Sequence, residues 1–337
     1  MPRTQRVRAR ACARSEVASE ATTAALSDPI RIAFAGTPAF AVPTLERLCA
    51  RADVGLVLTQ PDRRRGRGRR TEPSAVKLRA QALGVRVEQP AALRDSQLLK
   101  LWQFAPDILV VVAYGLLLPD WVRAWPRVGC VNLHASLLPR WRGAAPVQHA
   151  LLAGDPETGM SLMRIERALD RGPVFAAART PIGSTETAGE LHDRLATLAA
   201  DLIDTHLVDL VSGRLRPVPQ DDARATYAPK IAKSAAALDW RKSALELERQ
   251  VRAFNPWPVA ECSTTDGKRL RIYRARALDG SAGAVPGTIS SAGARGIDVA
   301  TGQGLLRLEI VQAEGGKAMD AAAYLAAHRL DGGAFRL

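Results

Sequence analysis

The sequence contains few residues of the kinds that mark secreted, metal-binding or membrane proteins. Its four cysteines, Cys12, Cys49, Cys130 and Cys262, lie far apart and show no metal-ligand spacing. No apolar run approaches the roughly 20 residues that cross a bilayer. We therefore expect reduced thiols, no bound metal, no membrane association and a cytosolic protein.

Lysine is also scarce, although the chain is strongly basic. Only seven of the 47 basic residues are lysine, and the formal net charge is +13. Such a charge favours a polyanionic partner. An excess of arginine and alanine is also typical of a GC-rich genome, so the positions of the charges are more informative than their total.

Residues 1–28 contain five arginines and almost no large apolar side chains. This composition predicts a disordered extension. The missing apolar stretch argues against a secretory signal, and the acidic residues Glu16, Glu20 and Asp28 argue against a mitochondrial transit peptide. We expect a dispensable or misassigned extension; a transit peptide would instead place the protein in the mitochondrial matrix.

Helix and strand patterns alternate from Ile30 to His134. The expected strands are 30–36, 54–59, 85–89, 107–114 and 130–134, and the expected helices are 38–49, 74–83, 95–104 and 119–125. This alternation predicts an α/β fold with a Rossmann-like, mostly parallel sheet and helices on both faces. Gly36-Thr37-Pro38 lacks the further glycines of a dinucleotide fingerprint, so we do not expect NAD binding.

The chain changes character after residue 212. Residues 213–234 are rich in proline and predict a linker that crosses the surface of the first domain. Residues 235–337 combine one helix with short strands separated by Gly and Pro, which predicts a small β-barrel. The expected organisation is therefore the extension 1–28, a catalytic domain 29–212, the linker and a C-terminal domain 235–337.

Asn132, His134 and Asp170 are the candidates for chemistry. The strand period puts Asn132 and His134 on one face, and an amide beside an imidazole suits stabilisation of a carbonyl oxygen that becomes an oxyanion. Asp170 lies in a tight loop between two expected strands, where it would hold the His134 ring in one tautomer and stabilise its charged form. Taken alone, the pair also fits a wet polar edge strand, and Asp170 an ordinary turn residue.

Several motifs occur in order along the chain: Asn-x-His at 132–134, Ser-Leu-Leu-Pro-Arg-Trp-Arg-Gly-Ala-Ala-Pro at 136–146, Leu-Asp-x-Gly at 169–172 and Phe-Asn-Pro-Trp-Pro at 254–258. Together they resemble the folate-dependent formyltransferases, most closely the branch that acts on charged tRNA. The resemblance covers nearly all of residues 30–330. It implies an OB-like C-terminal domain and, without a metal, formyl transfer from 10-formyltetrahydrofolate to the methionyl group of initiator tRNA for translation initiation.

The resemblance also implies roles for residues at matching positions. Asn132, His134 and Asp170 match the catalytic set. A loop with six arginines within residues 63–70 matches the segment that enters the tRNA acceptor stem, and Arg67 lies between its two glycines. The folate site is expected, largely through backbone groups, at Tyr114, Gly115, Leu116, Ser136, Leu137, Leu138 and Pro139. The expected tRNA contacts are Arg63, Arg67, Arg69, Arg70, Lys230, Lys268 and Arg271.

Arg171 departs from the family, which commonly has Thr between Asp and Gly. We expect its positive charge beside Asp170 to favour the carboxylate. Two alternatives stay open: a folate-dependent formyltransferase that acts on a sugar nucleotide or another small amine, and a non-catalytic RNA-binding protein with this fold. The arginine-rich loop and the basic second domain argue against the first, and the intact catalytic set argues against the second. We expect a monomer.

Overall fold

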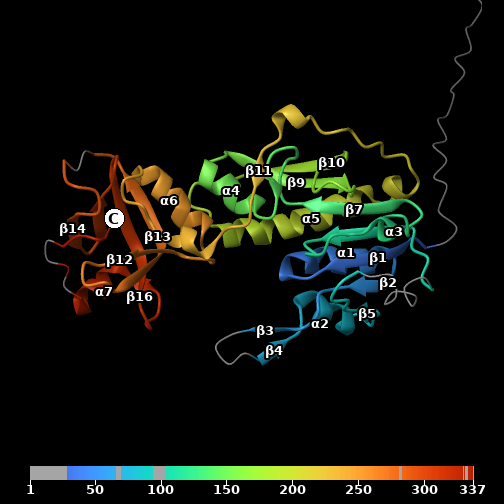
Figure 1. Cartoon of the computed structure of the whole chain (residues 1–337), viewed down its shortest axis with the longest axis horizontal. Coiled ribbons are helices and arrows are strands. Elements are labelled where there is room, and N and C mark those ends of the chain that lie inside the picture. The colour runs from blue at the N-terminus through green and yellow to red at the C-terminus, as the bar shows by residue number, and fades with distance from the viewer. Residues whose placement is uncertain are drawn as a thin grey trace, which may run out of the picture.

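The computed structural model describes residues 29–65, 70–93, 103–280, 283–328, 330 and 333–336. A mostly parallel sheet and an antiparallel sheet occupy opposite ends of the long axis of the molecule (Figure 1), and each has its own hydrophobic core. The extension expected at 1–28 and most of the helix expected at 95–104 lie outside the described residues. No helix in the described ranges is long and apolar enough to cross a membrane.

The N-terminal sheet has, among the described residues, seven strands in the order β10, β9, β7, β6, β1, β2, β5. Their bounds are β1 Arg31–Gly36, β2 Asp53–Leu58, β5 Val87–Glu88, β6 Ile108–Val112, β7 Gly129–His134, β9 Glu157–Arg164 and β10 Val174–Pro181. The neighbouring strands β7, β6, β1, β2 and β5 are parallel to one another. Strand β9 is antiparallel to β7, and β10 is antiparallel to β9. The expected mostly parallel α/β sheet is confirmed.

Helices cover both faces of this sheet, which explains its continuously apolar strands. Every residue of β6 is buried. One face packs against α1 Val42–Arg51, α2 Ala75–Ala82, α4 Pro146–Ala153 and α5 Ala188–Val211, and the opposite face packs against α3 Asp120–Arg123. The long helix α5 begins with a capping box, in which Thr187 and Glu190 satisfy free backbone N–H groups of its first turn.

The C-terminal domain is an antiparallel sheet in the order β12, β13, β16, β15, β14, with β17 paired to β16. The bounds are β12 Ala260–Ser263, β13 Arg269–Leu278, β14 Ile289–Gly293, β15 Gly296–Ala300, β16 Leu305–Ala313 and β17 Met319–Asp320, with helices α6 Ala244–Ala253 and α7 Ala321–Ala327. The chain end joins the two sheet edges, because Phe335 N–H donates to Gly287 O (2.9 Å) and Arg336 N–H to Ser263 O (2.8 Å). This closure gives the barrel-like form that the sequence predicts.

The segment between the two sheets runs along the N-terminal domain and pairs with the chain that follows β7. Strand β11 Tyr227–Ala228 lies parallel to β8 Arg142–Gly143. Further upstream, Val218 and Val174 exchange two backbone hydrogen bonds of 2.8 Å at the start of β10. The segment therefore contacts both the chain that follows β7 and the start of β10, beside the loop that carries Asp170.

Candidate active site

Asn132 and His134 lie on one face of β7, as the strand period predicts. Val131 and Leu133 pack into the core beneath α1 and α5, whereas Cys130 packs into the core on the opposite face. The sheet therefore fixes the direction of both polar side chains through the burial of their apolar neighbours.

His134 is buried, with 6% of its surface exposed, and both ring nitrogens face a protein oxygen. Nε2 lies 2.9 Å from the carbonyl oxygen of Trp141, and Nδ1 lies 3.8 Å from Oδ2 of Asp170. Because a carbonyl can only accept a hydrogen bond, Nε2 carries a proton and donates it. This contact with the backbone of Trp141 favours the tautomer that is protonated on Nε2. The role expected for Asp170 in holding the ring stays a prediction.

Asp170 enters the site from the loop between β9 and β10. Its φ of 51° lies in the left-handed region, which is uncommon for residues other than glycine but which Asp adopts more readily than most. Its Oδ2 accepts a hydrogen bond of 3.0 Å from the backbone N–H of Gly143. The 3.8 Å to His134 is too long for a direct hydrogen bond and suits a charge pair or a bridging water.

The carboxamide of Asn132 is the polar group at this site that stays available to a ligand. The residue is half-buried, and its side chain makes no hydrogen bond within the described ranges. A half-buried amide with unused donors, beside an imidazole, can stabilise negative charge on a carbonyl oxygen.

The turn after β7 is held by Ser161, a residue that the sequence analysis did not single out. Ser161 is fully buried on β9 opposite His134. Its hydroxyl donates to the carbonyl of Ser136 (2.7 Å) and accepts from the backbone N–H of Leu138 (3.1 Å). The sequence alone does not indicate this role. Ser161 is recognised as a neighbour of His134 once the pairing of β7 with β9 is known.

The residues expected to seat folate divide into buried supports and accessible groups. Tyr114 is a support: it is buried, burial raises the pKa of its hydroxyl, and its carbonyl accepts from Thr37 Oγ1 (2.9 Å) and Gln60 Nε2 (3.0 Å). The backbone of Gly115 is exposed, and the side chains of Leu116, Leu137, Leu138 and Pro139 are partly exposed. Open backbone groups and apolar side chains thus occur together here, and the folate site stays a prediction.

The charge of Arg171 is directed away from Asp170, contrary to the expectation. Its guanidinium pairs with Asp222, which also lies 2.8 Å from Nη1 of the buried Arg142. Hydrogen bonds first from Arg142 and then from Arg171 lower the pKa of the Asp222 carboxyl. The positive charge of Arg171 is therefore paired with the carboxylate of Asp222.

The residues expected to contact tRNA lie in three separate places. The strands β3 Arg63–Arg65 and β4 Arg70–Glu72 form a hairpin that projects from the N-terminal domain (Figure 1), but Arg67, Arg69 and the side chain of Arg70 lie outside the described parts. The Arg63 guanidinium donates to Gln60 Oε1.

The other expected tRNA contacts differ in their charge environment. Lys230 is exposed on the linker and has no acidic partner among the described residues. In contrast, Lys268 pairs with Asp266 at 2.7 Å, and Nε of Arg271 lies 3.8 Å from Glu261. The positive charge that clusters along β13 in the sequence is thus partly neutralised in the fold.

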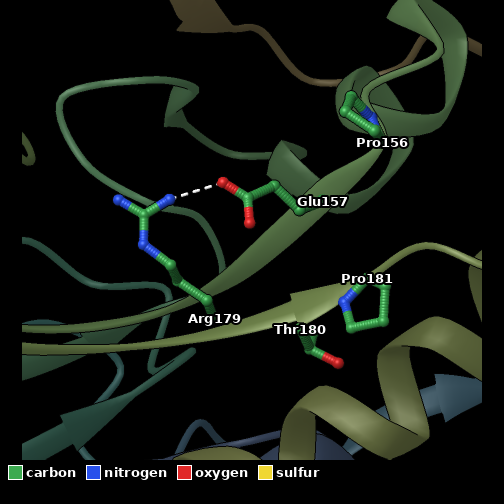
Figure 2. A pocket seen from close by; sticks show the side chains of 5 residues that line it. All are labelled: Pro156, Glu157, Arg179, Thr180 and Pro181. Atoms are coloured by element: carbon green, nitrogen blue, oxygen red, sulfur yellow. Dashed lines mark hydrogen bonds and ion pairs between the residues drawn. The ribbon is translucent and has the colours of Figure 1, made fainter.

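A surface hollow at the far end of the β9 and β10 hairpin does not include the catalytic candidates. It is lined by Pro156, Glu157, Arg179, Thr180 and Pro181, and Arg179 pairs with Glu157 across it (Figure 2). Within the described ranges, no cluster of three or more His, Cys, Asp or Glu side chains is arranged to hold a metal.

The chain thus combines a mostly parallel α/β sheet, with Asn132 and His134 near the end of β7, and an antiparallel C-terminal domain. Residues 30–207 match the family described as formyl transferase, and residues 230–329 match its C-terminal domain. The chain belongs to the formyl transferase family.

Similar proteins include two named methionyl-tRNA formyltransferase. That of Xylella fastidiosa (strain 9a5c) is 54% identical and that of Stenotrophomonas maltophilia (strain K279a) is 52% identical, each over 89% of this chain and 98% of the relative. Two solved structures share the fold at 15% identity. A sugar 3N-formyl transferase in the presence of dTDP and 5-N-formyl-THF has a TM-score of 0.60, with 84% of this chain and 97% of that chain covered. HypX from Aquifex aeolicus in complex with tetrahydrofolic acid has a TM-score of 0.58, with 92% and 51% covered.

Proposed function

We propose that this chain transfers the formyl group of 10-formyltetrahydrofolate to the α-amino group of methionine esterified to initiator tRNA, which gives N-formylmethionyl-tRNA for translation initiation. The observation that carries the proposal is the match, at 54% identity and over 98% of its length, to a methionyl-tRNA formyltransferase. The approach of His134 and Asp170 beside the free amide of Asn132 supports it. The alternative sugar-nucleotide acceptor rests only on likeness of fold.

Asn132 is the group that we assign to the developing oxyanion. The unprotonated methionyl amine attacks the formyl carbon, a new C–N bond forms, and the carbonyl oxygen gains negative charge. The Asn132 amide donates a hydrogen bond to this oxygen. A donor in such a position contributes about 3 kcal/mol to lowering the barrier.

His134 and Asp170 handle charge and protons at the same centre. Since Nε2–H of His134 is already bonded to Trp141 O, the ring donates to the substrate only through Nδ1, and therefore in its charged form. The carboxylate of Asp170, 3.8 Å away, stabilises that charge. A water bound to these two side chains would pass the proton from the attacking nitrogen to the departing folate nitrogen as the old C–N bond breaks.

The donor and the tRNA bind at different parts of the chain in this proposal. The backbone near Gly115 and the turn 136–139 would seat the folate. The β3 and β4 hairpin with Arg67, together with Lys230, Lys268 and Arg271, would contact the tRNA backbone. We assign the catalytic domain to residues 29–212, the linker to 213–234 and the C-terminal domain to 235–337, and we place the reaction in the bacterial cytoplasm.

A formylation assay with 10-formyltetrahydrofolate and charged initiator tRNA tests this function. Wild-type protein should turn over; Asn132→Ala should lower kcat by roughly 100-fold. Arg67→Ala should raise KM for the tRNA but leave reaction with a methionine ester at high concentration unchanged. Arg214→Ala, an exposed arginine paired with Asp209, is the control and should behave as wild type. Absence of turnover with Met-tRNA, together with formylation of an amino-sugar nucleotide, would overturn the proposal.

A further inference from the structure

We infer that Gln220, contributed by the segment between the two domains, positions Asp170 and is needed for the full rate of formyl transfer. The inference rests on the function proposed above. Gln220 lies 50 residues from Asp170 in the sequence and outside every motif that carries the family resemblance. It makes no contact with the atoms assigned to chemistry, so its role is to hold the loop that supplies one of them.

Both the nitrogen and the oxygen of the Gln220 carboxamide form hydrogen bonds. Nε2 donates to the carbonyl oxygens of Asp170 (2.9 Å) and Gly172 (2.7 Å), and Oε1 accepts from Nε of Arg142 (3.0 Å). The two carbonyls flank Arg171, so one side chain clamps the loop on both sides of that residue. The donors and the acceptor are all satisfied by specific protein partners, which defines the orientation of the amide.

The conformation of the Asp170 loop would be stabilised by such a clamp. Asp170 is held at φ 51°, a left-handed conformation that costs free energy for a residue with a Cβ, although less for Asp than for most. The loop also approaches β9 closely, because a Cβ added at Gly172 would lie 2.0 Å from the carbonyl oxygen of Arg164. Downstream, the two hydrogen bonds between Val218 and Val174 fix the register of the linker beside the loop.

Arg142 connects this clamp to the other side of Asp170. Its side chain is 1% exposed and lies between Gln220 and Asp222. The next residue, Gly143, donates its N–H to the Asp170 carboxylate at 3.0 Å. The backbone of Asp170 is thus held through Gln220 and its carboxylate through Gly143, and both supports converge on β8, which the linker strand β11 pairs with.

The test is a double-mutant cycle between Gln220 and Asp170. Gln220→Met keeps the length of the side chain and removes its hydrogen bonds; we expect kcat to fall about tenfold with KM for both substrates within about twofold, as for a misplaced catalytic group. In an Asp170→Asn background the same substitution should change kcat by less than about twofold. Gln220→Glu, which keeps the acceptor for Arg142 but loses both donors, should be as slow as Gln220→Met. The matched control is Gln312→Met, a half-buried glutamine of the C-terminal domain that bonds Tyr273 and the Gly316 carbonyl.

The outcomes separate positioning from a merely structural role. If Gln220 had only a general structural role, Gln220→Met would lower kcat by the same factor in the wild-type and the Asp170→Asn backgrounds, and that result would overturn the inference. A kcat of Gln220→Met equal to that of Gln312→Met would also overturn it. Amide hydrogen exchange of residues 170–172 gives a readout that does not depend on the acceptor: exchange should accelerate in Gln220→Met and not in Gln312→Met. If the wild type fails to formylate Met-tRNA, the proposed function fails, and the exchange result still decides whether Gln220 holds the loop.

Discussion

Ser161→Ala should destabilise the protein by about 2 to 3 kcal/mol and loosen the turn assigned to the folate. The side chain is fully buried, and its hydroxyl joins two parts of the same turn: it donates to Ser136 O at 2.7 Å and accepts from Leu138 N–H at 3.1 Å. Alanine fills nearly the same space, so the effect comes from the hydrogen bonds and not from a cavity.

The magnitude follows from what the substitution leaves behind. Each hydrogen bond contributes about 1 kcal/mol net, and a buried polar group left without a partner costs about 1 to 3 kcal/mol. Ser136 is fully buried and Leu138 is half-buried, so the carbonyl of Ser136 bears most of the cost. Water can reach the Leu138 N–H more easily, so the expected loss of stability lies near the lower end of the range of about 2 to 3 kcal/mol.

Urea unfolding and steady-state kinetics measure the two consequences separately. The midpoint should fall with the slope unchanged, and KM for 10-formyltetrahydrofolate should rise by roughly fivefold, the equivalent of about 1 kcal/mol of lost binding. Ser212→Ala is the control, because that hydroxyl is exposed and, among the described residues, donates a single hydrogen bond, to Asp209 O at 3.3 Å. Equal midpoints and equal KM values for the two variants would refute the argument that Ser161 holds the turn.

Three further predictions concern the site, the second core and pH. Asp170→Asn should lower kcat by roughly 100-fold with little change in KM, measured in the formylation assay; an unchanged kcat would remove Asp170 from the mechanism. Trp240→Ala should cost about 3 to 5 kcal/mol, because Trp240 is fully buried and stacks on Phe335; calorimetry should show the loss in the C-terminal transition. The pKa of Asp222 is lowered by Arg142 and Arg171, so its contribution is present above the unfolded pKa of about 3.9 and is lost as pH falls through the folded value. Thermal unfolding of Asp222→Asn should accordingly differ from wild type at about pH 6 and converge with it near pH 2.

The sequence predicted those features that depend on local period and burial. The alternation of apolar runs was enough to predict the parallel sheet, and the strand period was enough to put Asn132 and His134 on one face, because Val131 and Leu133 must enter the core. In each case the deciding interaction lies within a few residues along the chain.

Features that depend on contacts between distant segments were not predictable in the same way. The tautomer of His134 depends on Trp141 O, whose position follows from a φ of 61° at Trp141 that no residue preference indicates. Ser161 becomes visible as a support only after β7 and β9 are paired, and Gln220 only after the linker is laid against the Asp170 loop. Pairing of this kind is decided by the tertiary fold.

Arg171 illustrates how sequence neighbourhood and spatial neighbourhood diverge at this site. An arginine next to Asp170 in the chain suggests a charge that acts on that carboxylate. The left-handed backbone at Asp170 instead sends the two side chains apart: the carboxylate turns to Gly143 and His134, and the guanidinium turns to Asp222 on the linker. The unusual residue therefore adds a contact between the Asp170 loop and the linker, beside that of Gln220. The geometry of the site is in this way tied to the segment that joins the two domains.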